Sequence, residues 1–261
     1  MWIVLALLGN ALLAVVGIVD KFILNKSVTR PITFVFYSTI FVLPCFLLLP
    51  FGIKLPVVWT DYMLFAVSGL CFAFGLWTLY IAIEKSEISH VGPLIGATVP
   101  FFILFLGRIF LREKLSTYGL LAAIVLIIGS LVISFDLRKE HHRRWHPGLN
   151  WGILAGFLFA VSHVISKYAY DAYGFYSGFV LTKVSIGIFG VALLFFPSIR
   201  ALFHKKPKTD ASQARSKKRF ILVAGDIALG VTGATLVQYA VALGSVSLVN
   251  ALAGAQYAIL I

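Results

Sequence analysis

The sequence predicts an all-α polytopic membrane protein, and three observations carry that prediction. Of its 261 residues, 60% are hydrophobic and only 12% are charged, whereas a soluble domain has about 25% charged residues. Apolar runs recur along the whole chain, and each is near the roughly 20 residues that cross a hydrocarbon core as a helix. The net charge of +12 lies in the loops between those runs, a pattern typical of a surface that faces anionic lipid rather than nucleic acid.

Eight complete spans and the start of a ninth are predicted. The first begins at Trp2 with no charged region or cleavage signal, so we interpret it as a span and not a signal peptide. Basic segments separate the fifth span from the sixth and the seventh from the eighth; the second of these, 205–219, is expected to be solvated. The predicted spans are 2–24, 32–51, 62–83, 88–111, 118–135, 151–170, 175–196 and 220–243, and a ninth begins at Val246.

The fourth span carries a proline near its centre. Residues 92–107 contain no charge, and the charged cluster 108–114 follows as the interfacial end of the helix. Pro100 removes one backbone donor and is expected to kink the helix. The freed carbonyl group then needs a neighbouring donor or water, which a cavity beside the kink would supply. The alternative is that Pro100 only shapes helix packing.

The chain contains an internal repeat. Without a gap, residues 80–103 match residues 238–261 at seven positions, and residues 14–22 match residues 160–168 with Lys21 over Lys167. Many transporters are built from such repeats. The repeated unit holds five helices, an odd number, so the second unit must be inverted relative to the first. A helix that stopped at Ile261 would leave a terminus in hydrocarbon, and we expect a longer protein in which this chain stops within helix 9.

These stretches resemble the EamA family of the drug/metabolite transporter superfamily. The resemblance is carried by ALLAVVGIVDKFIL (11–24), by the long stretch 82–133 with its mid-helix proline, and by AVALGSVSLVNALAGAQYAILI (240–261). It implies ten helices in two inverted five-helix repeats. The first repeat is expected at 1–137, a linker at 138–150 and an incomplete second repeat at 151–261. Ala258 stands where the first repeat has Pro100, so a symmetric role for that proline is in doubt.

Charged and ionisable residues inside spans are costly and therefore informative. Lys183 and His163 are predicted to share a depth of roughly 10 Å from the loop between spans six and seven. A buried lysine binds anionic groups, and a histidine exchanges protons near neutral pH. The alternatives are snorkelling for Lys183 and a backbone hydrogen bond for His163. Asp226 is a second proton-coupling candidate; its expected partners are the basic residues of the loop between spans seven and eight, which precedes it, and not Lys183.

Neutral polar and aromatic residues in the spans suit a cavity for a small amphiphilic solute, although each is also suited to joining helices. They are Asn10, Tyr37, Trp77, Tyr80, Gln238, Tyr239, Asn250 and Gln256. No metal or cofactor is expected. The three histidines at 141–146 sit beside Arg143 and Arg144, which repel a cation.

The leading function is secondary transport of a small metabolite, such as an amino acid, nucleobase or drug-like solute, with export as the expected direction. No G-x-x-x-x-G-K-[ST] signature indicates ATP-driven transport. A non-transporting scaffold or sensor remains as an alternative. A lipid-phosphate enzyme is disfavoured because the ten acidic residues are scattered rather than clustered to hold Mg²⁺, so we do not expect an enzyme.

Membrane location and orientation give the last expectations. We expect a bacterial plasma membrane, with a small-molecule substrate and membrane lipid as partners, no nucleic acid, and homo-oligomer formation left open. The loops that follow spans one, three, five and seven hold most of the lysine and arginine, which favours their side as cytoplasmic and the N-terminus as outside. The family resemblance implies both termini inside. We favour the charge bias.

Overall fold

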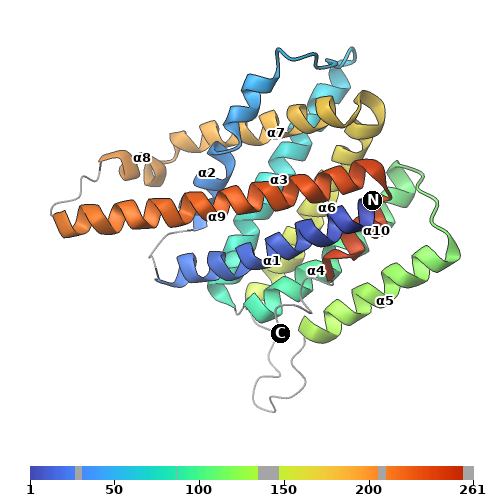
Figure 1. Ribbon diagram of the computed structural model, residues 1–261, viewed down its shortest axis with the longest axis horizontal. Coiled ribbons are helices and arrows are strands. Elements are labelled where there is room, and N and C mark those ends of the chain that lie inside the picture. The colour runs from blue at the N-terminus through green and yellow to red at the C-terminus, as the bar shows by residue number, and fades with distance from the viewer. Residues whose placement is uncertain (27–30, 87, 135–146, 205–209, 255–261) are drawn as a thin grey trace.

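The computed structural model describes residues 1–26, 31–86, 88–134, 147–204 and 210–254. Its described residues form helices connected by short loops (Figure 1). The helices are α1 Trp2–Lys26, α2 Pro31–Ile40, η1 Leu43–Leu48, α3 Trp59–Lys85, α4 Ile88–Phe110, α5 Thr117–Ser134, α6 Pro147–Tyr173, α7 Phe175–Ala192, η2 Leu193–Phe195, α8 Pro197–His204, α9 Asp210–Leu243 and α10 Val246–Ala251. Within the described residues, eight helical segments are long and apolar enough to cross a membrane, so the all-α polytopic fold class is confirmed.

Two predicted segments differ from the structure. The second span is not one helix: α2 ends at Ile40, and a 3-10 helix, η1, follows after a turn. Pro44 lies in the first turn of η1 and has no N–H to continue an α-helix. The eighth span agrees with the prediction at Phe220–Leu243, but its helix, α9, begins earlier, at Asp210, inside the segment that we expected to be a solvated loop.

Helices α1 and α9 run antiparallel and lie side by side in Figure 1. Trp2 packs on Gly244 at one end, where a Cβ atom on the glycine would lie 3.1 Å from the indole. Further along, the side chain of Leu13 packs on Gly233, 3.2 Å from the corresponding Cβ position. Small residues on α9 thus let α1 approach closely, as is common between helices in membranes.

Helices α3 and α6 form a second antiparallel interface with the same contacts in the same order. Gly148 packs against Ser86, and Phe159 packs against Gly75. When the alignment of the internal repeat is extended along the helices, α1 corresponds to α6 and α9 corresponds to α3. In the same alignment, the four residues named for this interface correspond to the four named for the first interface. The two interfaces are therefore related by the repeat. We call them the α1–α9 interface and the α3–α6 interface.

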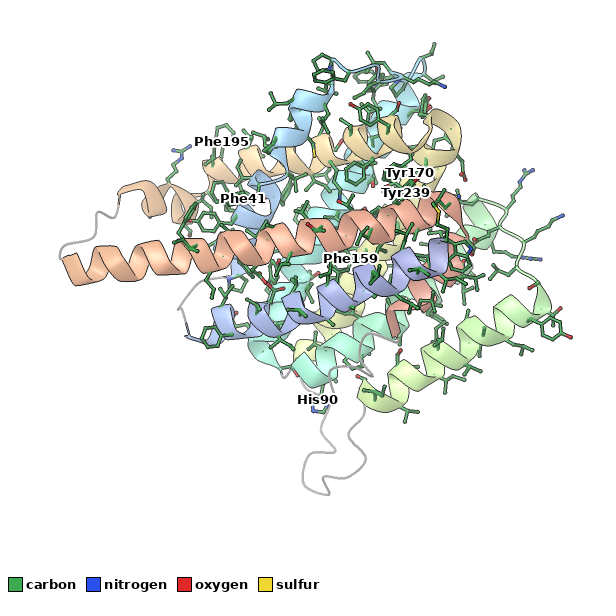
Figure 2. All side chains as sticks on the ribbon, viewed as in Figure 1. Phe41, His90, Phe159, Tyr170, Phe195 and Tyr239 are labelled. Atoms are coloured by element: carbon green, nitrogen blue, oxygen red, sulfur yellow. The ribbon has the colours of Figure 1, made fainter. Side chains whose placement is uncertain are left out.

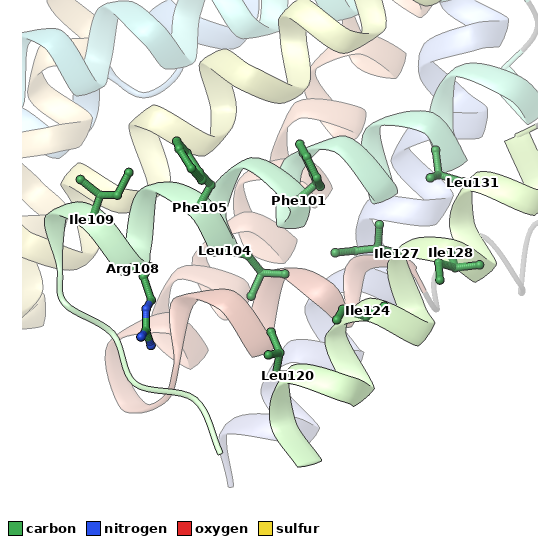
Figure 3. A pocket seen from close by; sticks show the side chains of 10 residues that line it. All are labelled: Phe101, Leu104, Phe105, Arg108, Ile109, Leu120, Ile124, Ile127, Ile128 and Leu131. Atoms are coloured by element: carbon green, nitrogen blue, oxygen red, sulfur yellow. The ribbon is translucent and has the colours of Figure 1, made fainter. Parts of the chain in front are cut away.

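The outer faces of α4 and α5 are apolar and exposed, as expected for helices in contact with lipid. A groove of about 610 Å³ lies between them. Figure 3 shows Leu104 of α4 and Leu120 and Ile124 of α5 pointing toward one another across it, with Arg108 at one end. The groove is lined by aliphatic and aromatic side chains, so its surface matches acyl chains rather than a polar solute.

The end of α4 is fastened to α10. The backbone N–H of Glu113 donates to the Gly107 carbonyl oxygen at 3.1 Å, which closes the last turn, and Arg112 adopts a positive φ of 51° there. The Glu113 carboxylate accepts a hydrogen bond from the Ser247 hydroxyl of α10. Glu113 therefore joins the end of α4 to α10, a role beyond the interfacial ion pair that its charged neighbours in the sequence indicate.

Candidate functional site

Lys183 lies on α7 in the interior of the protein and is only 8% exposed. Its ammonium nitrogen is 5.2 Å from the ring centroid of Phe72 on α3 and 5.2 Å from that of Phe179 on its own helix. Among the described residues, no carboxylate lies within ion-pair distance of it. Two aromatic faces attract a cation but leave its three hydrogen-bond donors without a counter-ion. Within the described residues, the buried ammonium therefore has aromatic neighbours and no carboxylate partner.

His163 lies on α6 near Lys183, close enough for the two side chains to interact electrostatically. Its Nδ1 atom is 2.6 Å from the carbonyl oxygen of Phe159, one turn earlier on α6. Since a carbonyl oxygen only accepts hydrogen bonds, Nδ1 carries the hydrogen, and Nε2 of the neutral ring is left as an acceptor. The structure thus places His163 near Lys183. It also contains the backbone hydrogen bond that was expected if His163 had only a structural role.

A pair of carboxyl groups lies in the α1–α9 interface. Asp20 of α1 is 6% exposed and Asp226 of α9 is 4% exposed, and the two side chains lie within hydrogen-bonding distance of each other. The Oδ1 atom of each has no hydrogen-bond partner among the described residues. Asp226 was singled out by its sequence, but its expected basic partners at 205–219 have side chains outside the described residues. The partner that the structure shows is another acid.

Tyr80 of α3 extends this group of polar side chains. It is buried and lies in electrostatic range of both carboxyl groups. Its hydroxyl group is 3.1 Å from the Ser38 hydroxyl of α2, and its ring packs against Phe34 in a tilted arrangement with centroids 4.7 Å apart. Its place in a solute cavity stays a prediction, and the neighbours that the structure shows are the carboxyl pair and Ser38.

The corresponding position of the α3–α6 interface holds hydroxyl groups. Ser68 of α3 lies 3.1 Å from the Ser162 hydroxyl and 3.4 Å from the Ser166 hydroxyl, both on α6. In the repeat register, Ser166 stands where α1 has Asp20, and Ser68 stands where α9 has Asp226. The same contact is therefore made by two hydroxyls in one interface and by two carboxyls in the other.

The remaining candidates are dispersed. Gln238 is buried and accepts a hydrogen bond of 3.0 Å from the Tyr170 hydroxyl. Tyr170 and Tyr239, both labelled in Figure 2, pack on the same ring, that of Phe175, at centroid distances of 5.3 and 4.9 Å. The Nδ2 atom of Asn10 is buried without a partner among the described residues. Asn250 donates to a carbonyl oxygen of its own helix at 2.8 Å.

The other expectations concern packing residues or positions outside the described residues. Trp77 stacks on Phe74 with centroids 6.1 Å apart, and Tyr37 is half-buried on α2. Gln256 lies outside the described residues, as do the histidines at 141–146. Pro100 lies within α4, a helix that also contains Pro93; that Pro100 bends the helix stays a prediction.

Sequence reasoning missed several residues of these sites. Asp20 lies beside Lys21 near the end of the first predicted span and was not singled out. Asp61 was also missed: it is buried at the start of α3 and accepts hydrogen bonds from the Tyr168 and Tyr173 hydroxyls of α6. The available signal for Asp20 was the repeat register, which aligns it with Ser166. No group of three His, Cys, Asp or Glu side chains in the described part could hold a metal ion.

Comparisons with known proteins agree with this architecture. The model of the EamA-like transporter family matches residues 1–135. A solved structure, described only as a crystal structure of a protein, superposes with a TM-score of 0.60 at 17% sequence identity, covering 97% of this chain and 82% of that one. At this identity the likeness shows the fold alone. No curated protein matches the sequence significantly.

Proposed function

This chain belongs to the EamA-like transporter family, and from that premise we propose that it is a secondary transporter of a small metabolite that carries an anionic group. We further propose that it exports this solute across a bacterial plasma membrane by alternating access, with the solute and the surrounding lipid as its partners. It makes and breaks no covalent bond, and solute or ion gradients supply the driving force.

The observation that carries the proposal is the buried Lys183 ammonium without a carboxylate partner. A charge in this position is expensive unless something neutralises it. A carboxylate or phosphate of the solute would do so, and the Phe72 and Phe179 rings beside it would contact an apolar or aromatic part of the same molecule. Nε2 of His163 would accept a hydrogen bond from a donor such as an amino or hydroxyl group. An amino acid has this combination of groups.

The two related interfaces supply a physical basis for alternating access. From the start of the eighth span at Phe220, Asp226 lies about 9 Å along the helix. Ser68 lies about 10 Å from Asp61, counted from the opposite end of the bundle. The Asp20–Asp226 contact thus joins helices in one half of the membrane, and the Ser68–Ser166 contact joins helices in the other half. Opening one interface while the other stays closed would expose a central solute to one side at a time.

The experiment that tests the proposal is a ligand panel on the purified full-length protein in detergent. Amino acids, nucleobases, nucleotide sugars and cationic drugs would be compared by the shift in melting temperature that each causes. We expect an anionic solute to stabilise the wild type and to lose at least tenfold in affinity with Lys183→Met, while His163→Gln weakens binding less. Lys85→Met is the matched control, because Lys85 is exposed and lies 5.4 Å over the Trp151 ring at the protein surface.

Two outcomes would count against the proposal. Selective stabilisation by a cationic drug, unchanged in Lys183→Met, would exclude an anion site at Lys183. Absence of uptake of any stabilising solute into proteoliposomes, in either direction across an imposed gradient, would exclude transport and favour a scaffold or sensor. Accumulation in inside-out vesicles but not in right-side-out cells would support export.

A further inference from the structure

We propose that Asp20 and Asp226 together bind the coupling proton of this transporter, and that release of this proton separates α1 from α9. The inference rests on the proposed transport function and names the ion that drives it. The described structure contributes three observations: the burial of both acids, their mutual contact, and the contrast with the hydroxyl pair at the equivalent position of the α3–α6 interface.

The contact between the two acids requires a bound proton or cation that reduces their charge repulsion. Both side chains are buried within spans, and they approach within hydrogen-bonding distance. Two carboxylates have only acceptor oxygens, so they repel each other and make no hydrogen bond. If one oxygen is protonated, it donates to the other carboxylate and the contact becomes attractive. Two like charges in contact at a site of low dielectric are therefore expected to hold one proton between them.

No other described side chain provides this neutralisation. From α3, the facing titratable group is the Tyr80 hydroxyl, which is paired with the Ser38 hydroxyl of α2. Neither group is a cation. The Oδ1 atoms of both acids have no partner among the described residues. Lys21 follows Asp20 in the sequence, and its side chain is outside the described set, so the experiment below includes it.

The internal repeat shows what is special about this contact. The equivalent pair, Ser68 and Ser166, makes the same helix contact at 3.4 Å with groups that stay neutral at every physiological pH. Hydroxyls are therefore sufficient to join two helices at this position. Because the α1–α9 interface has carboxyl groups at this position, it can respond to protons, whereas the hydroxyl pair cannot. The carboxyl pair lies in the half of the bundle next to the basic loops.

The coupling step is a simple proton transfer. In the closed state one O–H bond is present in the pair, and the net charge of the two groups is −1. On release, that O–H bond breaks, the proton moves to water, and the bonding electrons stay on the carboxylate oxygen. The pair then carries −2, its attraction becomes repulsion, and α1 separates from α9. For an exporter, the proton moves opposite to the solute.

The proton can be observed without any solute. Infrared difference spectra of the purified full-length protein, titrated from acid to alkaline pH, report the C=O stretch of protonated carboxyl groups. We expect one buried protonated carboxyl near neutral pH in the wild type. Its band should disappear in the Asp20→Ser/Asp226→Ser double variant, which places in the α1–α9 interface the residues that the α3–α6 interface already has. Asp61→Asn is the control, because it removes a different buried acid and should retain the band.

Four results would overturn the proposal. The first is a wild type without a protonated carboxyl at neutral pH. The second is a band that remains in the double variant while the variant is folded, as judged by its melting transition and elution as a single species. The third is a band that appears only in Lys21→Gln, which would show that the lysine neutralises the pair. Stabilisation of the wild type by Na⁺ at neutral pH, lost in the double variant, would likewise replace the proton by a sodium ion.

A transport assay separates this inference from the function on which it rests. In proteoliposomes, a pH gradient should drive solute movement by the wild type, and the double variant should lose this response while still exchanging solute for solute. Solute movement by the wild type that ignores the pH gradient would overturn the coupling role and leave the proposed transport intact. Proton binding in the infrared without any solute movement would overturn the transport function instead.

Discussion

Gly9 of α1 lies against Gly233 of α9 so closely that a Cβ atom on Gly9 would be 2.8 Å from the Gly233 carbonyl oxygen. The backbones of the two helices therefore touch, and a side chain at this point must push them apart. This contact lies on the same interface as Asp20 and Asp226. The glycines thus determine how closely α1 and α9 approach, and the two acids determine how the interface responds to protons.

Gly9→Ala should therefore destabilise the protein by about 1–3 kcal/mol, because overpacking a close contact forces the backbone to shift. Gly225→Ala on α9 is the matched control. A Cβ atom there would meet nothing within 4 Å, and the replacement should be neutral or stabilise the helix by up to about 1 kcal/mol. Melting temperatures in detergent give the comparison. Equal effects of the two replacements would show that the close contact does not exist.

Asp61 gives a prediction at the opposite end of the bundle. It is buried and accepts hydrogen bonds from two tyrosine hydroxyls of α6, Tyr168 and Tyr173. Asp61→Asn leaves one acceptor oxygen and turns the other into a donor, so one tyrosine hydroxyl loses its partner. We expect a loss of about 1–3 kcal/mol in the free energy of unfolding.

The control for Asp61 is Asp171→Asn on α6. Asp171 is largely exposed and forms a surface ion pair of 2.9 Å with Lys167, a kind of contact that contributes about 0–1 kcal/mol. Its replacement should leave the melting temperature nearly unchanged. If Asp171→Asn were as damaging as Asp61→Asn, burial of the Asp61 carboxylate would not be the reason for its contribution.

The joining of α4 to α10 can be tested in the same way. Ser247→Ala removes the hydroxyl that donates to the Glu113 carboxylate and leaves a partly buried charge without that donor. A loss of about 1–3 kcal/mol is expected. Ser116→Ala, which removes a hydroxyl that accepts from an exposed backbone N–H at 3.1 Å, should cost about 1 kcal/mol or less. A Ser247→Ala protein as stable as the wild type would contradict a structural role for this link.

Hydropathy alone predicted most of the architecture, because each span must satisfy its backbone internally and bury or expose apolar side chains over a fixed length. It did not predict the interruption at Pro44. A proline within an apolar run is compatible with a kinked helix, and α4 does accommodate Pro93 and Pro100. What distinguishes η1 is tertiary packing, since it lies against α7, and such packing is not encoded in the composition of one segment.

The candidate site was harder to predict because a polar residue in a span has several uses. Lys183 and His163 were expected to share a depth in the membrane, because the loop between their helices is short. The pairing of Asp20 with Asp226 required knowing that α1 packs on α9, which are about 200 residues apart in the chain. The repeat register contained the correspondence with Ser166 and Ser68, but it did not say which helices touch.

Replacement of Lys183 gives the sharpest separation of function from stability. A buried ammonium without a counter-ion costs stability in the empty protein, so Lys183→Met, of similar length but apolar, should raise the free energy of unfolding by up to about 3 kcal/mol. Solute binding should be lost at the same time, since the anion partner is gone. Lys183→Arg keeps the charge and should retain part of the binding.

The control Lys85→Met removes an exposed cation that lies over the Trp151 ring. It should lower stability slightly, by about 0.5–1 kcal/mol, and leave binding unchanged. Melting temperatures with and without the stabilising solute measure both quantities in one experiment. A Lys183→Met protein that is less stable than the wild type would mean that the ammonium serves the fold, and the anion would then have to bind elsewhere. If Lys183 serves substrate binding rather than the fold, its replacement by Met should raise stability and abolish binding together.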